Sequence, residues 1–295
     1  MLNLLEMKTF TTLVECQSSS KTAELLGVAN SAVSRRIKDL ESHLGVQLIK
    51  RTTRRMSVTD DGMHFYQRCR RILEDIEEAE HELNNQARDI KGTIKLSAPL
   101  SFGVKHLAPI ITEFMLAYPA INIDVDLTDR RIDLLEEGFD LAIRIGKLED
   151  SSLRARKLAP IRHLVCASPQ FLSAHGPIET PSQLQDLPAL CYSNIKHPDR
   201  WDFTDQYGKK GSVRIQAKMR SSNGDTLRHA ACAGLGLICE PEFIVKDCLA
   251  NNTLKAILTD YTWYEMNLYA VYPQTRFVSK RLRVFIDFLA AHFDV

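Results

Sequence analysis

The stretch Lys21–Thr59, KTAELLGVANSAVSRRIKDLESHLGVQLIKRTTRRMSVT, decides how the N-terminal part of the chain folds. Its pattern predicts a short helix over 21–26, a tight turn at Gly27, a second helix over 31–44 and a basic hairpin. Glycine at the turn suits the left-handed backbone that ends a helix. This order of elements is typical of a winged helix-turn-helix, in which the second helix enters the major groove of DNA.

The second helix of this stretch has two different faces. Val33 and Ile37 lie four residues apart and predict a core face. The opposite face is polar and basic near its N-terminal end. It carries Asn30, Ser31, Ser34, Arg35 and Lys38. Asparagine pairs with adenine and arginine with guanine, while hydroxyls reach phosphates or base edges. A merely solvated face would carry similar residues, but the basic hairpin that follows favours DNA.

The hairpin and its charges strengthen that interpretation. Two short strands, 48–51 and 56–58, flank a turn that contains Arg54 and Arg55, which could enter a minor groove or hold phosphates. Residues 31–56 hold seven lysines and arginines against two acidic residues, although the whole chain has a net charge of only +1. A local basic block in a near-neutral chain indicates a polyanionic partner.

A long helix is predicted directly after the hairpin. Residues 60–90 contain no proline, and Gly62 is their only glycine. Apolar residues recur at steps of four and three, which is the spacing of a heptad seam. The seam consists of Phe65, Cys69, Ile72, Ile76, Ala79 and Leu83. We expect it to pair two copies of the chain; the alternative is a buried helix of a monomer.

The rest of the chain alternates between predicted strands and helices. The predicted strands are 93–97, 121–127, 140–145, 163–167, 235–239 and 268–272, and the predicted helices are 101–118, 132–138, 225–233 and 277–293. Alternation at this spacing predicts an α/β region with parallel strands. About 200 residues of this kind indicate two lobes with a cleft, where ligands bind at the carboxyl ends of strands.

Two predicted helix starts in this region could hold a small anion. Residues 97–103 (SAPLSFG) join a strand to a helix and place the Ser101 hydroxyl at the helix start. Residues 221–224 (SSNG) precede a second helix in the same way. Backbone amides at a helix N-terminus attract carboxylates and phosphates. We therefore expect a small anionic metabolite here; the alternative is that the hydroxyls only cap their helices.

The sequence resembles that of the LysR-type transcriptional regulators along essentially its whole length. In the N-terminal part the resemblance rests on residues 30–37 (NSAVSRRI) and on Thr59-x-x-Gly62, and the wing sequence RTTRR points to one subgroup. In the rest it rests on GTIKLSAP (92–99), DLAIRIG (140–146), ASPQFL (167–172) and GLGLICEP (234–241). The order of these motifs is specific.

The resemblance implies a fold. It is an α/β chain with an N-terminal all-α winged helix-turn-helix and a two-lobed, periplasmic-binding-protein-like (type 2) effector domain. The implied domains are 1–59 for DNA binding, 60–91 for a dimerising linker helix and 92–295 for the effector domain. Lobe I covers about 92–160 and 267–295, and lobe II covers about 161–266. The chain would cross between the lobes near 159–160 and near 265–266.

The resemblance also implies sites and partners. It carries over the DNA contacts predicted above, with Arg54 on the wing. The implied effector site is lined by Pro99, Leu100, Ser101, Phe102, Thr128, Ile145, Asn223 and Gly224. The implied partners are an imperfect palindromic operator of double-stranded DNA, a small effector, RNA polymerase, and further copies of the chain in a homodimer or homotetramer.

One departure from the family pattern affects the base-reading residues. Ala29 stands where a serine commonly caps the recognition helix. We predict that Asn30 or Ser31 takes over that cap. Asn30 would then be less free to read a base, so Arg35 is the stronger candidate.

Composition and missing motifs exclude several other classes. No apolar run reaches about 20 residues and no secretory signal is visible, so we expect a cytoplasmic protein without membrane contact. The cysteines are 16, 69, 166, 191, 232, 239 and 248, and none forms a CxxC pair. We expect no metal, cofactor or catalytic residue, because the enzyme motifs that we sought are absent. A thiol-based redox sensor within the same family is an alternative, although no cysteine pair looks poised.

Overall fold

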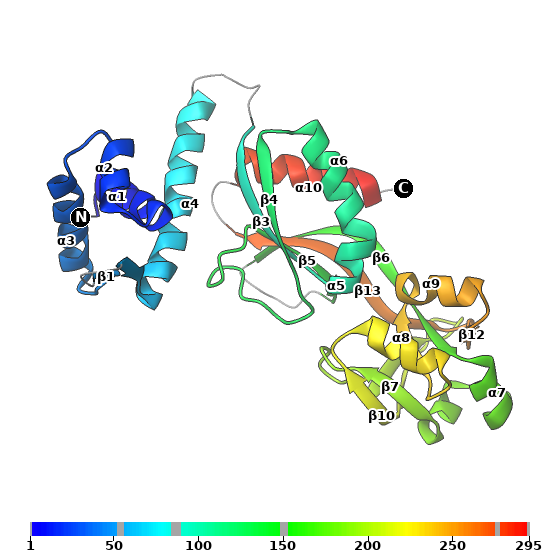
Figure 1. The fold of residues 1–295 in the computed structure, drawn as a ribbon. Coiled ribbons are helices and arrows are strands. Elements are labelled where there is room, and N and C mark those ends of the chain that lie inside the picture. Colours follow the sequence, from blue (N-terminus) through cyan, green and yellow to red (C-terminus); the bar gives the residue numbers. More distant parts are fainter. Residues whose placement is uncertain (1, 52–55, 84–89, 148–152, 275–277, 294–295) are drawn as a thin grey trace. The chain divides into compact units, whose positions relative to one another are not determined.

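The computed structural model describes residues 2–51, 56–83, 90–147, 153–274 and 278–293. It divides into two compact units, residues 1–89 and 90–295 (Figure 1). Arg54 and Arg55 of the predicted wing tip lie outside the described residues, as do residues 84–89 at the end of the predicted linker.

The N-terminal unit begins with three helices: α1 (Leu4–Cys16), α2 (Ser19–Leu25) and α3 (Asn30–Leu44). The Ser18 side chain caps α2 by accepting a hydrogen bond from the backbone of Lys21. Gly27 has φ +63° and turns the chain from α2 toward α3, as predicted. Phe10, Leu13 and Leu40 are fully buried where α1 and α3 pack.

The hairpin and the long helix complete this unit. Strands β1 (Ile49–Arg51) and β2 (Met56–Val58) pair antiparallel, and α4 (Asp60–Leu83) follows. The Thr59 hydroxyl accepts a hydrogen bond from the backbone of Gly62 and so caps α4. A Cβ atom on Gly62 would lie 2.2 Å from the carbonyl oxygen of Leu48, so only glycine fits where α4 approaches β1.

Lobe I of the C-terminal unit is built on three parallel strands. These are β3 (Gly92–Ala98), β4 (Ile121–Leu127) and β5 (Leu141–Gly146), with β3 in the middle. The helices of lobe I are α5 (Leu100–Phe102), the π-helical turn η1 (Gly103–Leu107), α6 (Ala108–Ala117) and α10 (Lys280–Phe293). Helices α6 and α10 pack over one face of the sheet through Phe114 and Phe285 (Figure 1).

Two long strands connect the lobes. Strands β6 (Leu153–Ala167) and β13 (Thr262–Pro273) pair antiparallel along their length. At one end β13 pairs with β5 of lobe I, and at the other β6 pairs with β11 of lobe II. The pairing shifts register between Trp263 and Met266. The chain therefore crosses twice between the lobes, once along β6 and once along β13.

Lobe II contains many short elements that the sequence analysis did not predict. Its helices are α7 (Pro169–His175), η2 (Pro181–Asp186), α8 (Gly224–Cys232) and α9 (Glu242–Ala250). Its strands are β7 (Pro188–Tyr192), β8 (Arg200–Thr204), β9 (Lys210–Arg214), β10 (Gln216–Ser221), β11 (Ile238–Pro241) and β12 (Lys255–Ile257). Two apolar clusters, centred on Trp263 and Leu227, form its core.

The predicted helix over 132–138 is wrong. The segment consists of turns, because the Asp133 side chain accepts hydrogen bonds from the backbones of Leu135 and Glu136. Gly138 then adopts φ +79° before β5 begins. A short aspartate side chain that bonds to nearby backbone in this way competes with helix formation.

Among the described residues, one stretch has the length and composition of a membrane span. It is the helical run Leu100–Ala117, with a mean hydropathy of 1.2. Its residues Phe102, Leu107 and Phe114 are buried in the lobe I core, and 28% of the run is buried in all. The absence of membrane contact stays a prediction.

Candidate functional site

Helix α3 presents the predicted polar and basic face to solvent. Val33 and Ile37 are buried against α1, which turns the opposite face outward. On that face Asn30, Ser31, Arg35 and Lys38 are exposed and Ser34 is half-buried. The structure therefore brings the five predicted residues of this helix onto one edge.

The N-terminal cap of α3 differs from the prediction. Ala29 is the cap residue and no side chain bonds to the free backbone amides, so the expectation that Asn30 or Ser31 caps the helix is wrong. The Asn30 amide nitrogen instead lies 3.4 Å from the Ser20 hydroxyl. Its amide oxygen is not used in a cap, which strengthens Asn30 as a base-reading candidate.

Two cations of α3 point away from the protein. Within the part of the chain that the structure describes, Arg35 and Lys38 make no ion pair. Arg36 is different, because its guanidinium donates to the Thr9 hydroxyl at 3.2 Å and ties α3 to α1. Arg36 is thus a packing residue, whereas Arg35 and Lys38 are available to a phosphate or a base.

The wing is fixed to α3 by one carboxylate. Glu41 accepts hydrogen bonds from the backbones of Leu48 at 2.8 Å and Ile49 at 2.9 Å. Lys50 and Ser57 are exposed and pair across the two strands. These two hydrogen bonds therefore fix the orientation of the wing relative to α3, and Lys50 lies on the exposed face of the wing.

The first half of the predicted dimer seam packs within its own unit. Cys69 is fully buried in the core with Phe10, and the Phe65 and Phe10 ring centroids lie 5.6 Å apart. Cys69 cannot contact a second chain, which corrects the predicted seam at this position. Ile72, in contrast, is 46% exposed, and Ile76 is partly exposed. The side chains of the remaining seam residues, Ala79 and Leu83, lie outside the described part.

In the C-terminal unit, some of the predicted effector residues lie where the two lobes meet. The Ser101 hydroxyl of lobe I donates to the Asp225 carboxylate of lobe II at 2.5 Å. The Asn223 side chain caps α8 and donates to Asp129 of lobe I at 3.2 Å. Pro99 is the cap residue of α5, whose first amide, on Leu100, donates to Asp129 at 3.1 Å.

Other predicted effector residues take different positions. The Thr128 hydroxyl accepts a hydrogen bond from the backbone of Arg130 at the end of β4. The Phe102 ring is 3% exposed and packs edge-on against Phe243 of α9, so it is part of the packing between the lobes. Ile145 packs against the lobe I core.

Carboxylates that were not predicted from the sequence dominate this boundary. Asp129 and Asp225 occupy donors that we expected an anionic ligand to use. Glu240, at the end of β11, is 4% exposed, and a Cβ atom on Gly224 would lie 2.7 Å from its carboxyl oxygen. Burial, with Asp225 and Asp129 nearby, raises the pKa of Glu240 to about 8. Glu240 is therefore mostly protonated at neutral pH.

One half-buried guanidinium lies near Asp129. Arg144 of β5 donates to the Ser97 hydroxyl at 3.3 Å and to the Ile143 carbonyl. Among the described residues, no carboxylate lies within ion-pair distance of it. Burial lowers its pKa, and the charge of Asp129 partly opposes that effect. Arg144 is the cation best placed to receive the carboxylate of a ligand.

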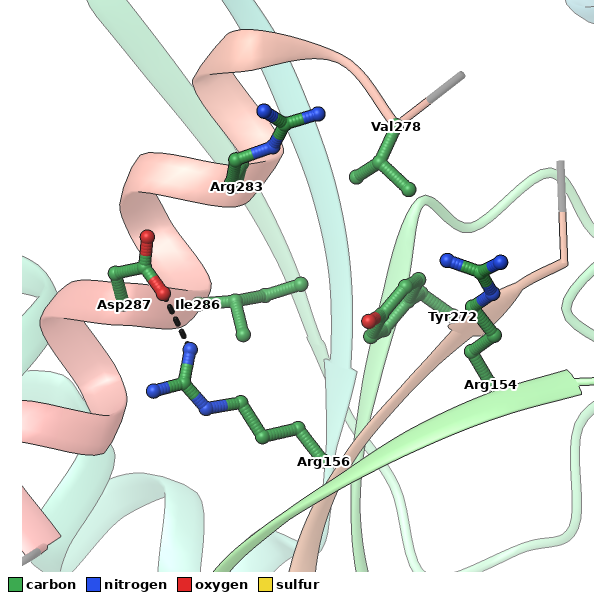
Figure 2. A pocket seen from close by; sticks show the side chains of 7 residues that line it. All are labelled: Arg154, Arg156, Tyr272, Val278, Arg283, Ile286 and Asp287. Carbon is green, nitrogen blue, oxygen red and sulfur yellow. Dashed lines mark hydrogen bonds and ion pairs between the residues drawn. The ribbon is translucent and has the colours of Figure 1, made fainter. Parts of the chain in front are cut away.

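A separate basic hollow lies on lobe I (Figure 2). It has a volume of about 280 Å³ and lies between α10 and the lobe I ends of β6 and β13. Figure 2 shows Arg156 paired with Asp287 across it, while Arg154 and Arg283 flank Tyr272. Three arginines against one carboxylate give this hollow a net positive charge. No local sequence pattern marks this hollow, because its residues come from three separate segments.

Two cysteines of lobe II lie in contact. The sulfur atoms of Cys232 on α8 and Cys248 on α9 are 3.6 Å apart. The expectation that no cysteine pair is poised is therefore wrong for this pair. No group of three or more potential metal ligands occurs among the described residues.

Comparisons with known proteins match both units. The family model described as "Bacterial regulatory helix-turn-helix protein, lysR family" matches residues 4–63. The model described as "LysR substrate binding domain" matches residues 87–294. The transcriptional regulator CrgA of Neisseria meningitidis serogroup C is 35% identical over 285 residues, which are 96% of this chain and 95% of CrgA.

Solved structures show the same architecture. The structure of CrgA from Neisseria meningitidis, a LysR-type transcriptional regulator, matches with a TM-score of 0.61 and 34% identity over the full length of both chains. The Vibrio cholerae virulence activator AphB matches with a TM-score of 0.61 and 26% identity, over 99% of this chain and 100% of that chain. The predicted fold class is confirmed.

Proposed function

The chain belongs to the LysR family of bacterial transcriptional regulators, and we propose that α3 and the wing bind an imperfect palindromic operator. The observation that carries this proposal is the outward edge of α3, where Arg35 and Lys38 have no acidic partner among the described residues. In a helix-turn-helix such an edge enters the major groove. Two copies of the chain would present two such edges to the two half-sites.

Variants of Arg35 test the reading of bases. We expect Arg35→Ala to weaken binding to the specific operator by about 1–3 kcal/mol and to leave binding to random DNA nearly unchanged. The matched control is Arg68→Ala, which removes an exposed arginine from α4. The measurement is fluorescence anisotropy at several salt concentrations. Equal losses on operator and random DNA would mean that Arg35 only holds phosphate.

We propose that a small anionic metabolite binds at the lobe boundary and regulates the protein. Arg144 would receive its carboxylate, and the Ser101 hydroxyl would exchange Asp225 for the ligand. Because Asp225 is a lobe II residue, that exchange would change how the lobes meet. In a dimer or tetramer the change would alter DNA bending and contact with RNA polymerase.

Calorimetry with small carboxylic acids and their neutral amides tests the effector site. We expect acids to bind, and we expect Arg144→Gln to weaken them by about 1.5–3 kcal/mol, the usual value of a charged hydrogen bond. Ser101→Ala should weaken them less. Ser173→Ala, in an exposed position on α7, is the control. Binding of the amides and not the acids would contradict the proposal.

We propose that self-association uses exposed apolar surfaces on both units. On α4 the candidate is Ile72 with Ile76. On lobe I the candidates are Leu116, which is 79% exposed, and Val104, which is 57% exposed. Burial of such side chains contributes about 25 cal/mol per Å² of apolar surface removed from water. Two surfaces of this kind are compatible with a homodimer or a homotetramer.

A further inference from the structure

The contact between Cys232 and Cys248 joins two helices of lobe II. Cys232 is the last residue of α8 and is partly exposed, whereas Cys248 lies on α9 and is 8% exposed. Their sulfur atoms are 3.6 Å apart, and a disulfide needs about 2.05 Å. Bond formation therefore needs the two sulfur atoms to approach by about 1.5 Å.

The same pair is connected to the boundary between the lobes. One guanidinium nitrogen of Arg228 lies 3.9 Å from the Cys248 sulfur, and another lies 3.1 Å from Asp225. Asp225 in turn accepts the hydrogen bond from Ser101 of lobe I. A continuous series of contacts thus runs from the thiol to the contact between the lobes. The Nε atom of Arg228 is buried and finds no partner in the described residues, so two contacts hold the guanidinium in place.

We propose that Cys232 and Cys248 form a reversible disulfide on exposure to a hydroperoxide, and that this weakens the Asp225–Ser101 contact. When Cys248 enters a disulfide, its sulfur gives up the contact with Arg228. The guanidinium then moves and takes Asp225 with it. Oxidation would therefore act on the residue pair at which we place the effector, without occupying that site.

The chemistry of the pair balances with a hydroperoxide as the oxidant. The thiolate of Cys232, the more exposed residue, attacks the peroxide, so that a sulfur–oxygen bond forms and the oxygen–oxygen bond breaks. The leaving oxygen takes up a proton and departs as water or an alcohol. Cys248 then attacks the Cys232 sulfur, the disulfide forms and the second oxygen leaves as water. The peroxide accepts the two electrons that the thiols lose.

Burial should make the reaction of this pair with a peroxide slow, because it disfavours the reactive thiolate. It raises the pKa of Cys232, and the Cys248 thiol strengthens that effect. Arg228 opposes it because its positive charge favours the thiolate. Cys166 and Cys239 are less suitable partners, because neither sulfur atom contacts Cys232 among the described residues and burial raises the pKa of both thiols.

Peptide mapping of the full-length protein tests the bond itself. Trypsin cleaves after Arg228, Lys246 and Lys255, which separates Cys232 and Cys248 into two peptides, 229–246 and 247–255. After treatment with hydrogen peroxide we expect these peptides to be linked, with the loss of two hydrogen atoms and of two titratable thiols. Dithiothreitol should reverse the link. Its absence from the oxidised wild-type protein would overturn the proposal.

Three variants assign the bond and its effect. Peptide 229–246 also contains Cys239, so Cys239→Ala is the matched control, which should still form the link. Cys232→Ala and Cys248→Ala should not. In wild-type protein, oxidation should change operator affinity about fivefold or more, the low end of allosteric coupling. An unchanged affinity in fully linked protein, or an equal change in Cys248→Ala, would overturn the coupling to the lobes.

Discussion

Replacing Glu240 by glutamine should change how the stability of lobe II depends on pH. The Glu240 side chain is 4% exposed, lies against Gly224 and makes no hydrogen bond or ion pair within the described residues. Burial raises its pKa to about 8 in the folded protein, from an ordinary value of 4.5. Folded protein therefore keeps a proton that unfolded protein has released, so stability must fall as the pH rises through this window.

The size of the effect follows from the two pKa values. Each pH unit between about 4.5 and 8 lowers the free energy of unfolding by about 1.4 kcal/mol, because the folded state binds one proton more than the unfolded state. Between about pH 5.5 and about pH 7.5 the loss is about 2–3 kcal/mol. The Glu240→Gln variant keeps the shape of the protonated side chain but cannot ionise. It should lose this slope and be more stable than wild type near pH 8.

Tryptophan fluorescence during urea unfolding is a suitable assay. The chain has two tryptophans, Trp201 and Trp263, and both are buried in the core of lobe II. Glu242→Gln, which removes an exposed carboxylate at the start of α9, is the control and should keep the wild-type slope. If Glu240→Gln and wild type lost stability in parallel with rising pH, the buried proton would not be on Glu240.

Three further predictions concern the packing of α4, self-association and a surface ion pair. Gly62→Ala should destabilise residues 1–89 by about 1–3 kcal/mol, seen as faster hydrogen exchange, because its Cβ would meet the Leu48 carbonyl. Ile72→Glu should weaken self-association at least about tenfold in sedimentation, whereas Met63→Glu, an exposed position on another face of α4, should not. Asp287→Asn should cost less than about 1 kcal/mol in thermal unfolding, because its pair with Arg156 is half-exposed.

The sequence was most informative where side chains repeat with a clear period. Helix α3 and the hairpin were predicted closely, because apolar spacing, Gly27 and the cap at Thr59 all act locally. Strands β3, β4 and β5 were also found, since apolar residues recur at short spacing in each; in β4 (INIDVDL) they alternate strictly with polar residues. The short strands of lobe II were missed. Strand β8 (RWDFT) does alternate polar and apolar residues, but it is only five residues long, and β9 (KGSVR) has a single apolar residue, Val213, so neither gives a sustained pattern.

The chemistry of the lobe boundary could be predicted only in part. Ser101 and Asn223 were found because Ser101 lies in the first turn of a helix and Asn223 directly precedes one, which are local signals. Asp129, Asp225 and Glu240 were missed, since carboxylates far apart in the sequence carry no sign that folding brings them together. The contact of Cys232 with Cys248 was missed for the same reason, because it depends on how α8 packs on α9.

The seam on α4 shows a limit of periodicity. The heptad spacing correctly marked an apolar stripe, but a period does not identify what covers the stripe. Phe65 and Cys69 are covered by α1 of the same chain, and the Tyr66 hydroxyl donates to Glu15 there. Ile72, one turn further on, is left 46% exposed. The helix therefore changes its role along its length, from packing within its unit to a surface that a second chain could cover.

Asp225 is where the proposed signals converge. It lies in the first turn of α8, where the helix dipole stabilises its negative charge. One carboxyl oxygen pairs with Arg228, and the other accepts the hydrogen bond from Ser101 of the opposite lobe. An anion at Ser101 would displace Asp225 directly, whereas a disulfide at Cys248 would displace it through Arg228. Both inputs remove the same contact, so oxidation and effector should be less than additive in their effect on operator binding.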